Sequence, residues 1–281
     1  MDNFGFWESW FAWRDAMLVS LLCAAPLAYL GVWVVLKRVV YVPLALSQVS
    51  SVGVVLAYLL GSWLGVHSHT AYGCGILLDP SWLSLFAAFG AACWFAHPRE
   101  DSLLAVVASY LISGAAVLIL GGYLGQEMHD VQSVLFGNAV LVESRQIAYV
   151  GAAALLVAVI HFLFHRRFLF VSFDPDAAGA AGLRPYRMEI LLYATFALMI
   201  SVATRAIGAL PAFGLMVLPA MTALRLARGM RGAFIAASLL GLFAAGFGYY
   251  LSFRLGYPTG AAMVGLSGLA YLVSLAVRRR S

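Results

Sequence analysis

Histidine and carboxylate side chains gather in two segments that lie between apolar stretches of the chain. His67 and His69 occur near Asp79 in one segment, and His129 is followed by Asp130 in the other. Imidazole nitrogens and carboxylate oxygens are common protein ligands of divalent metals. We therefore consider His67, His69, His129 and Asp130 as candidate metal ligands at the mouth of a pathway. Solvated loop histidines give the same pattern. The sequence does not fix the geometry of either segment, so it does not decide between the two interpretations.

A second polar group lies inside the otherwise apolar stretch 42–64. Ser47, Gln48, Ser50 and Ser51 follow one another closely there. Hydroxyl and amide groups in an apolar helix either line a pathway for a polar solute or hydrogen-bond to a neighbouring helix. The sequence supports the two interpretations about equally.

Proline interrupts the apolar stretch 207–224 at Pro211 and again at Pro219. Each proline removes a backbone donor and frees a carbonyl oxygen, which then needs a partner in the protein or in a polar cavity. This stretch is therefore a candidate wall of a pathway. Kinks that only shape helix packing produce the same pattern.

The cap signals in 173–183 predict one short helix. Asp174 suits the N-cap, Pro175 the first helical position and Asp176 the positive end of the helix dipole. Gly182 and Leu183 are typical of a left-handed C-terminal stop.

The body of this short helix carries almost no large side chains, with Ala178 and Gly179 near its centre. It can bury little area in its own chain, but its backbone can approach a groove of another protein closely. We predict that it is a docking element for a partner. A bulky charged residue at either position is expected to uncouple that partner and leave the fold intact.

The composition predicts the elements that must position these residues. Of the 281 residues, 63% are hydrophobic and 10% are charged, and the mean hydropathy is +0.93, whereas soluble domains contain roughly 25% charged residues. A membrane-spanning helix needs about 20 apolar residues, and about nine stretches qualify, some only marginally. We expect an all-α polytopic membrane protein with a single transmembrane domain over 1–281 and one short cytosolic helix. The expected spans are 17–36, 42–64, 82–96, 103–123, 147–164, 188–203, 207–224, 233–253 and 260–277.

Basic residues are distributed unevenly between the two ends of these spans. If the spans alternate in direction, thirteen of the 17 Lys and Arg residues fall on one side. Cytoplasmic loops carry an excess of Lys and Arg, so we expect the N-terminus outside the inner (plasma) membrane, and the C-terminus and the short helix in the cytoplasm. This distribution explains the net charge of +5 without a nucleic-acid partner. The partners around the spans are membrane lipids.

The positions of the charged residues also bear on the source of energy. No acidic residue is expected at the middle of a span, where carriers driven by proton or sodium gradients usually need one. The only lysine, Lys37, follows Leu36 without a preceding glycine-rich phosphate loop. We therefore expect no cofactor and no enzymatic activity in this chain, a source of energy outside it, and any nucleotide to be handled by another polypeptide.

Two further patterns are similar to enzyme motifs. Ser267, in the run Gly-Leu-Ser-Gly, resembles the serine motif of rhomboid-type intramembrane proteases, but no histidine follows His165 to serve as its base. Close helix packing is the favoured interpretation of this run, with the protease as a remote alternative. His161 and His165 share a helix face, but Phe162 stands where a zinc protease needs Glu. We expect this pair at the cytosolic interface beside Arg166.

Taken in order along the chain, these landmarks resemble the membrane permease subunits of ATP-driven zinc and manganese importers. The resemblance covers nearly all of the chain. It implies half of a permease pair, with a second copy or a paralogue, two cytosolic ATPase subunits and an extracytoplasmic substrate-binding protein. It also implies that 174–183 contacts the ATPase and that the helix of Pro219 lies by the translocation path. The segments that carry the resemblance are 31–38, 135–138, 173–183, 207–210 and 218–223.

One pair of positions departs from the pattern of that family. The family's second helix typically starts with an Asp and has a His four residues later, on the same helix face, whereas this chain has Leu44 and Gln48. Leucine cannot bind a cation, and a neutral amide is a weak ligand for zinc. Transport of zinc or manganese is the first expectation, and a different solute such as a metal chelate is the alternative. The expected path comprises Ser47, Gln48, Ser51, Gly208, Pro211, Pro219 and Thr222.

Overall fold

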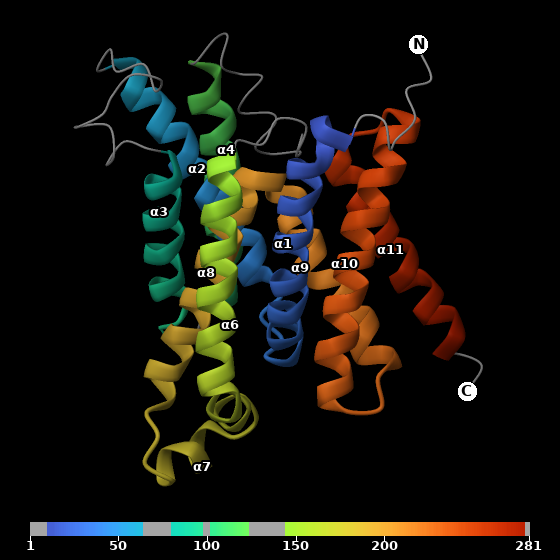
Figure 1. Ribbon diagram of the computed structural model, residues 1–281. Coiled ribbons are helices and arrows are strands. Elements are labelled where there is room, and N and C mark those ends of the chain that lie inside the picture. The colour runs from blue at the N-terminus through green and yellow to red at the C-terminus, as the bar shows by residue number, and fades with distance from the viewer. Residues whose placement is uncertain (1–9, 64–79, 98–101, 124–143, 279–281) are drawn as a thin grey trace.

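The computed structural model describes residues 10–63, 80–97, 102–123 and 144–278 (Figure 1). Within these ranges the chain forms ten helices and no strand, which confirms the expected all-α class. The helices are α1 (Trp10–Leu36), α2 (Tyr41–Trp63), α3 (Pro80–Phe95), α4 (Ser102–Gly122), α6 (Ser144–Phe173), α7 (Pro175–Ala180), α8 (Pro185–Ile207), α9 (Ala209–Leu226), α10 (Met230–Leu255) and α11 (Thr259–Arg278).

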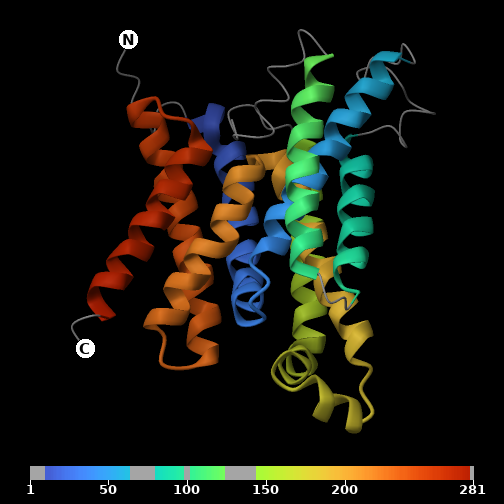
Figure 2. The ribbon, with the colours of Figure 1, turned by 180° about the vertical axis from the view of Figure 1, so that it is seen from behind.

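All of the described helices except α7 are apolar, as the composition predicts. Eight of them are long and apolar enough to cross a membrane. The remaining one, α3, has 16 residues and is about 24 Å long at 1.5 Å per residue, which is less than the roughly 30 Å of a bilayer's hydrocarbon core. Consecutive long helices alternate in direction, so α1 begins at one end of the molecule and α11 runs toward the other (Figures 1 and 2).

Helix α1 packs against α6, α8, α9 and α10 in the centre of the bundle. Its backbone approaches that of α9 so closely at Gly31 that a Cβ there would lie 1.6 Å from the carbonyl oxygen of Met216. At Gly241 of α10, a Cβ would lie 2.7 Å from the Cβ of Ala28. Small residues allow this close approach, which drives helix association in lipid. The two glycines therefore fit α1 tightly to α9 and α10.

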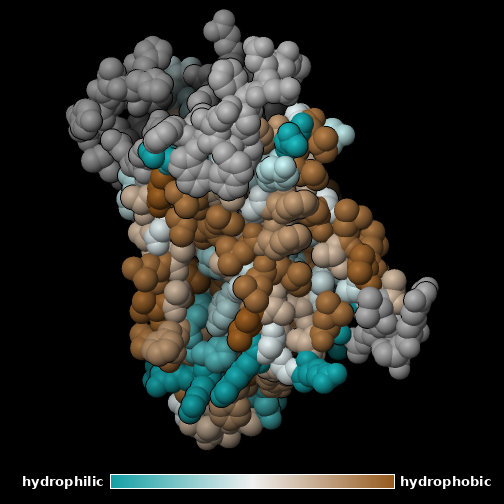
Figure 3. Space-filling view, turned by 45° about the vertical axis from the view of Figure 1, so that its right-hand side comes forward, coloured by the Kyte–Doolittle hydropathy of each residue, from teal (hydrophilic) through white to brown (hydrophobic). Residues whose placement is uncertain are grey.

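The periphery of the bundle is apolar. On α4, Leu104 and Ile112 are among the most exposed hydrophobic side chains, at 67% and 69%. Figure 3 shows hydrophobic side chains across the middle of the molecule and hydrophilic ones toward the end that carries α7. An apolar surface of this extent needs an apolar surrounding. We conclude that this band faces lipid.

Helix α6 changes direction near its C-terminal end. Its last turns run crosswise to the rest of the helix and are seen end-on in Figures 1 and 2. Helix α7 follows at the far end of the molecule, and α8 returns into the bundle. Helix α7 is therefore held outside the apolar band by two long helices.

Candidate coupling helix and translocation path

The beginning of α7 is fixed by a local contact that the sequence predicts. Oδ1 of Asp174 accepts a hydrogen bond from the backbone N–H of Ala177 at 2.9 Å, and Pro175 begins the helix. This N-cap satisfies one of the free N–H groups of the first turn. Asp176 adds a second carboxylate to that turn, where the helix dipole favours negative charge.

The end of α7 is a Schellman motif. The N–H of Leu183 donates to the carbonyl of Ala178, and the N–H of Gly182 donates to the carbonyl of Gly179, both at 3.0 Å. Gly182 has a φ of 83°, a left-handed conformation that glycine adopts without strain. The predicted helix stop is confirmed, whereas the role of α7 in coupling to an ATPase stays a prediction.

The two central residues of α7 differ in exposure, because consecutive residues point about 100° apart around a helix. Ala178 is fully buried, at 0% exposure, so the helix face that carries it packs against the rest of the chain. Gly179 is exposed, and among the described residues the atom nearest to a Cβ there would be Cγ of Pro185, at 3.9 Å. Leu183 is half-buried. The outer face of α7, which a partner can reach, comprises Asp174, Pro175, Asp176, Gly179 and Gly182.

On α2, two of the buried serine hydroxyls bond within their own helix. Oγ of Ser47 donates to the carbonyl of Leu44 at 2.8 Å, and Oγ of Ser51 donates to the carbonyl of Ser47 at 2.9 Å. Such bonds satisfy the hydroxyl without help from a neighbouring helix. The interpretation of this patch as a source of interhelical hydrogen bonds is therefore wrong for these two residues.

Gln48 and Ser50 differ from their neighbours in keeping a buried polar atom unpaired. Within the described part of the chain, Oε1 of Gln48 and Oγ of Ser50 have no hydrogen-bond partner. Gln48 lies against α4, where a Cβ on Gly114 would be 3.9 Å from Oε1. A buried polar group without a partner costs about 1–3 kcal/mol. These two atoms are therefore suited to bind a ligand, and Ser50 joins the candidate path on this observation.

A single residue, Gly208, connects α8 to α9. Its φ of 98° and ψ of 158° lie in a region that is essentially restricted to glycine. Its N–H donates to Thr204 at 3.0 Å, and its carbonyl accepts from Ala212 at 3.1 Å. The backbone of this turn therefore requires Gly208, independently of any role in a path.

The two prolines of α9, Pro211 and Pro219, are buried. One turn beyond Pro219, the hydroxyl of Thr222 donates to the carbonyl of Leu218 at 2.9 Å. Helix α9 packs mainly against α1, α10 and α11, whereas α2 packs mainly against α3 and α4. The expected path therefore divides into two groups, on helices that pack mainly against different neighbours. The first group, on α2, is Ser47, Gln48 and Ser51, and the second, on α9 or directly before it, is Gly208, Pro211, Pro219 and Thr222.

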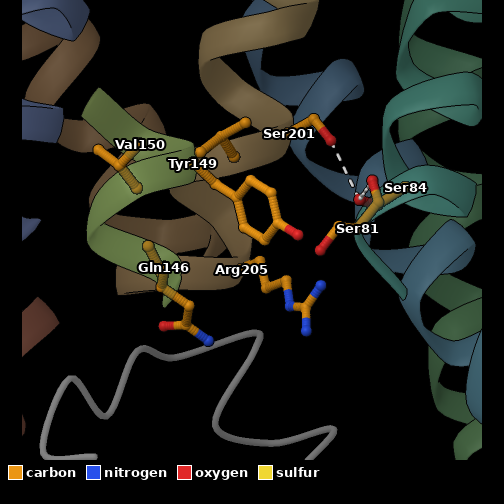
Figure 4. A pocket seen from close by; sticks show the side chains of 9 residues that line it. Ser81, Ser84, Gln146, Tyr149, Val150, Ser201 and Arg205 are labelled. Atoms are coloured by element: carbon orange, nitrogen blue, oxygen red, sulfur yellow. Dashed lines mark hydrogen bonds between the residues drawn. The ribbon is translucent and has the colours of Figure 1, made fainter. Parts of the chain in front are cut away.

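A cavity of about 40 Å³ lies between α3, α6 and α8, at the end of the bundle opposite α7 (Figure 4). Tyr149 and Arg205 extend toward Ser81, and Ser84 and Ser201 share a hydrogen bond of 3.1 Å. The space is sufficient for a few water molecules. Sequence reasoning missed this cavity, and its one signal was Arg205, which is among the few basic residues at this end.

The candidate metal ligands His67, His69, His129 and Asp130 lie outside the described residues. Within the described ranges, His, Cys, Asp and Glu side chains nowhere form a group of three or more that could hold a metal ion. The proposed mouth therefore stays a prediction.

The structure corrects the expected position of His161. Its side chain is 2% exposed and does not lie at a cytosolic interface beside Arg166. Nε2 of His161 lies 3.1 Å from Oγ1 of Thr195, and the ring centroids of Trp33 and Phe168 lie 5.9 and 5.1 Å from that of the imidazole. The expectation failed because two of these contacts come from α1 and α8, which are distant from His161 in sequence.

Ser267 is not arranged as a nucleophile. Its hydroxyl donates to the carbonyl of Met263 at 3.0 Å within α11, and a serine nucleophile needs a base within hydrogen-bond reach. The three described histidines, His97, His161 and His165, are hydrogen-bonded to other residues. This geometry supports close packing for Ser267 over the protease alternative.

The sequence matches the family model described as the ABC 3 transport family over residues 11–278. It is similar to the high-affinity zinc uptake system membrane protein ZnuB of Haemophilus influenzae, with 28% identity over 271 residues that cover 94% of this chain and 97% of the relative. It is 28% identical over 257 residues to the chelated iron transport system membrane protein YfeC of Yersinia pestis, with coverage of 92% and 83%. It is 23% identical over 261 residues to the manganese transport system membrane protein MntC of Listeria monocytogenes, with coverage of 93% and 89%.

The fold is similar to that of a solved structure, PsaBC from Streptococcus pneumoniae in complex with Fab. The TM-score is 0.78 at 19% sequence identity, and the match covers 93% of this chain and 90% of the other. The family match begins in α1 and continues to the end of α11, so it includes α7 and the whole candidate path. The chain therefore belongs to the ABC 3 transport family.

Proposed function

We propose that this chain is the permease subunit of an ATP-binding-cassette importer that moves divalent metal ions into the cytoplasm by alternating access. The observation that carries the proposal is α7, a capped helix of six residues held on α6 and α8 with an exposed outer face (Figure 2). The relatives add the substrate class, because they are named as membrane proteins of zinc, manganese and chelated-iron transport systems.

The outer face of α7 is suited to an ATPase subunit. A free helix of six residues is unstable in water, and caps at both ends keep α7 formed before a partner arrives. We infer that two ATPases bind here, one to each half of a permease pair, and that a substrate-binding protein docks at the opposite end. Zinc or manganese is the cargo in this scheme, and ATP is bound by the partner.

The distribution of charge supports an orientation in the inner membrane that places α7 on the cytoplasmic side. Basic residues near α7 include Lys37, Arg184 and Arg187, whereas Arg205 and Arg254 are at the opposite ends of α8 and α10. Figure 3 shows the hydrophilic side chains toward the α7 end. An excess of basic residues marks the cytoplasmic side. The N-terminus is then outside and the C-terminus cytoplasmic.

Gln48 favours manganese over zinc as the transported ion. Its buried Oε1 is unpaired within the described residues, and carbonyl-type oxygens suit manganese better than zinc, which prefers nitrogen and sulfur. Leu44, one turn earlier, supplies no ligand. Further ligands for the ion would come from the binding protein or from the second permease.

Import of a metal chelate is the second candidate, and Leu44 favours it. A chelate carries its own ligands, so a path without a carboxylate and an imidazole at positions 44 and 48 does not prevent its passage. The similarity to a membrane protein of a chelated iron system is consistent with such a cargo.

Uptake into proteoliposomes tests both candidates. The vesicles hold this chain with its ATPase and receive ATP, the binding protein and either free manganese, free zinc or a chelated metal. We expect ATP-dependent accumulation of manganese above zinc, and none with an ATPase whose catalytic glutamate is replaced. Accumulation of the chelated metal alone would favour the second candidate. If no metal accumulates although the loaded binding protein stimulates ATP hydrolysis, the proposal of a metal cargo is wrong.

A further inference from the structure

We propose that α1 takes part in coupling together with α6 and α8, the two helices that flank α7. Polar contacts join these three helices pairwise near α7 and transmit the movement of α7 to α9. The inference rests on the proposed function, in which α7 receives the movement of an ATPase. It assigns positioning roles to side chains outside the expected site, which are Tyr29 and Lys37 at α1, His161 and His165 on α6, and Glu189 and Thr195 on α8.

The contact between α1 and α8 is an ion pair. Nζ of Lys37 donates to Oε1 of Glu189 at 2.7 Å, and the side chains are 12% and 30% exposed. Lys37 directly follows α1, and Glu189 lies near the start of α8, a few residues after α7. A short charge-assisted hydrogen bond holds its partners more strongly than a neutral one. The helix that leaves α7 is therefore tied to the end of α1.

The contact between α1 and α6 joins Tyr29 to His165. The hydroxyl of Tyr29 and Nδ1 of His165 share a hydrogen bond of 3.0 Å. Helix α6 continues beyond His165 to Phe173 and then leads into α7. The helix that enters α7 is therefore also tied to α1.

The contact between α6 and α8 is directional. The hydroxyl of Thr195 donates its hydrogen to the carbonyl of Leu192 at 2.6 Å, so Oγ1 accepts from Nε2–H of His161 at 3.1 Å. His161 and Thr195 are 2% and 1% exposed. Buried hydrogen bonds in apolar surroundings are strong and geometrically demanding. The two helices that flank α7 are thus fixed to each other as well as to α1.

Aromatic rings pack against the two histidines of these contacts. The indole ring of Trp33 has its centroid 5.9 Å from that of His161, 5.4 Å from that of His165 and 5.1 Å from that of Phe234 on α10. Trp33 is fully buried. Because His161 and Thr195 are buried, they cannot exchange each other for solvent. The helices should move together at this point.

Helix α1 passes the movement on through Gly31. This glycine lies between Tyr29 and Lys37, and a Cβ on it would be 1.6 Å from the carbonyl oxygen of Met216 on α9. No side chain separates the two backbones here, so a shift of α1 displaces α9 directly. Met216 precedes Pro219 by three residues, and a proline is where a helix bends most readily. The movement of α7 thereby reaches the candidate path.

Charge reversal at the ion pair tests the inference. Metal transported per ATP hydrolysed, and stimulation of the ATPase by the loaded binding protein, are measured for Lys37→Glu, Glu189→Lys and the double variant in proteoliposomes. We expect each single variant to lower both readouts about fivefold or more, in the range of coupling between contacting residues, and the double variant to restore most of the loss. Glu189→Gln should be more harmful than Lys37→Gln, because it leaves the less exposed charge unpaired.

The matched control is Arg228→Gln, which removes an exposed positive charge from the connection between α9 and α10 and should behave as wild type. A purely structural ion pair would lower the thermal midpoint of the complex and leave metal transported per ATP unchanged, which would overturn the inference. Full activity of the single variants, or failure of the double variant to recover, would overturn it too. Failure of the proposed function gives a different result, because then the wild type itself accumulates no metal. Stimulation of its ATPase still reports on the contacts that join α1, α6 and α8.

Discussion

Replacing Gly179 with arginine separates docking of α7 from folding of α7. A Cβ at this position has Cγ of Pro185 as its nearest described neighbour, at 3.9 Å, which is an ordinary van der Waals distance. Within a helix, loss of glycine stabilises the helical state by about 0.5–1 kcal/mol. Gly179→Arg should therefore leave the thermal midpoint of the purified chain unchanged or slightly raised.

The same substitution should disrupt coupling. The new side chain extends from the outer face of α7, and overfilling a packed contact costs about 1–3 kcal/mol, which corresponds to a loss of about 5- to 150-fold in affinity for the ATPase. ATP-dependent metal uptake and stimulation of ATP hydrolysis by the binding protein are the assay. Gly179→Ala, which adds only a methyl group, is the control for the loss of glycine itself.

Ala178 provides the contrasting result. On the sequence alone both central residues suit this experiment, but Ala178 is fully buried. A charged side chain there must push α7 away from α6 and α8 or be buried without a partner. Ala178→Arg should therefore lower the thermal midpoint and the yield of folded protein. Normal uptake and normal ATPase stimulation by Gly179→Arg would refute the assignment of the outer face of α7 as the docking surface.

Three further changes have defined outcomes. Asp174→Ala should cost about 1 kcal/mol of α7 stability, because it removes the acceptor of the 2.9 Å hydrogen bond at the N-cap; faster amide exchange in α7 measures this loss, and equal exchange in Asp174→Asn and Asp174→Ala would contradict it. Gly31→Ala should lower the thermal midpoint by forcing α1 from α9, at a cost of about 1–3 kcal/mol or more, whereas the control Gly90→Ala has no described atom within 4 Å of the new Cβ and should have little effect. Adding ligands with Leu44→Asp and Gln48→His together should raise uptake of zinc relative to manganese by about tenfold; an unchanged ratio would place the selective step elsewhere.

Much of the fold is predictable because its signals are local. The long helices follow from runs of apolar residues that only lipid or a protein interior can accept. Helix α7 is predictable from residues within ten positions of one another. Asp174 accepts a hydrogen bond from the N–H three residues later, and the N–H groups of Gly182 and Leu183 end the helix by donating to Gly179 and Ala178. Such interactions need no knowledge of distant segments.

The candidate path was less predictable. Its residues other than Gly208 lie in apolar helices, as expected, but the sequence could not decide what each polar group contacts. Ser47 and Ser51 bond to their own helix, whereas Gln48 keeps an unpaired oxygen beside α4. Which partner a hydroxyl or amide finds depends on which neighbouring helix lies within about 3 Å of it, and helix packing sets that distance.

Three features were decided by the tertiary structure alone. Ala178 is an inner residue because α7 rests on α6 and α8. His161 is buried because Trp33 of α1 and Thr195 of α8 meet it on α6, and Lys37 finds its carboxylate at Glu189, 152 positions away. The sequence determined the membrane class, the helices and the caps, since each depends on neighbours along the chain. The faces that helices present to one another depend on how backbones pack, and contacts such as Gly31 against Met216 decide this only after the bundle has assembled.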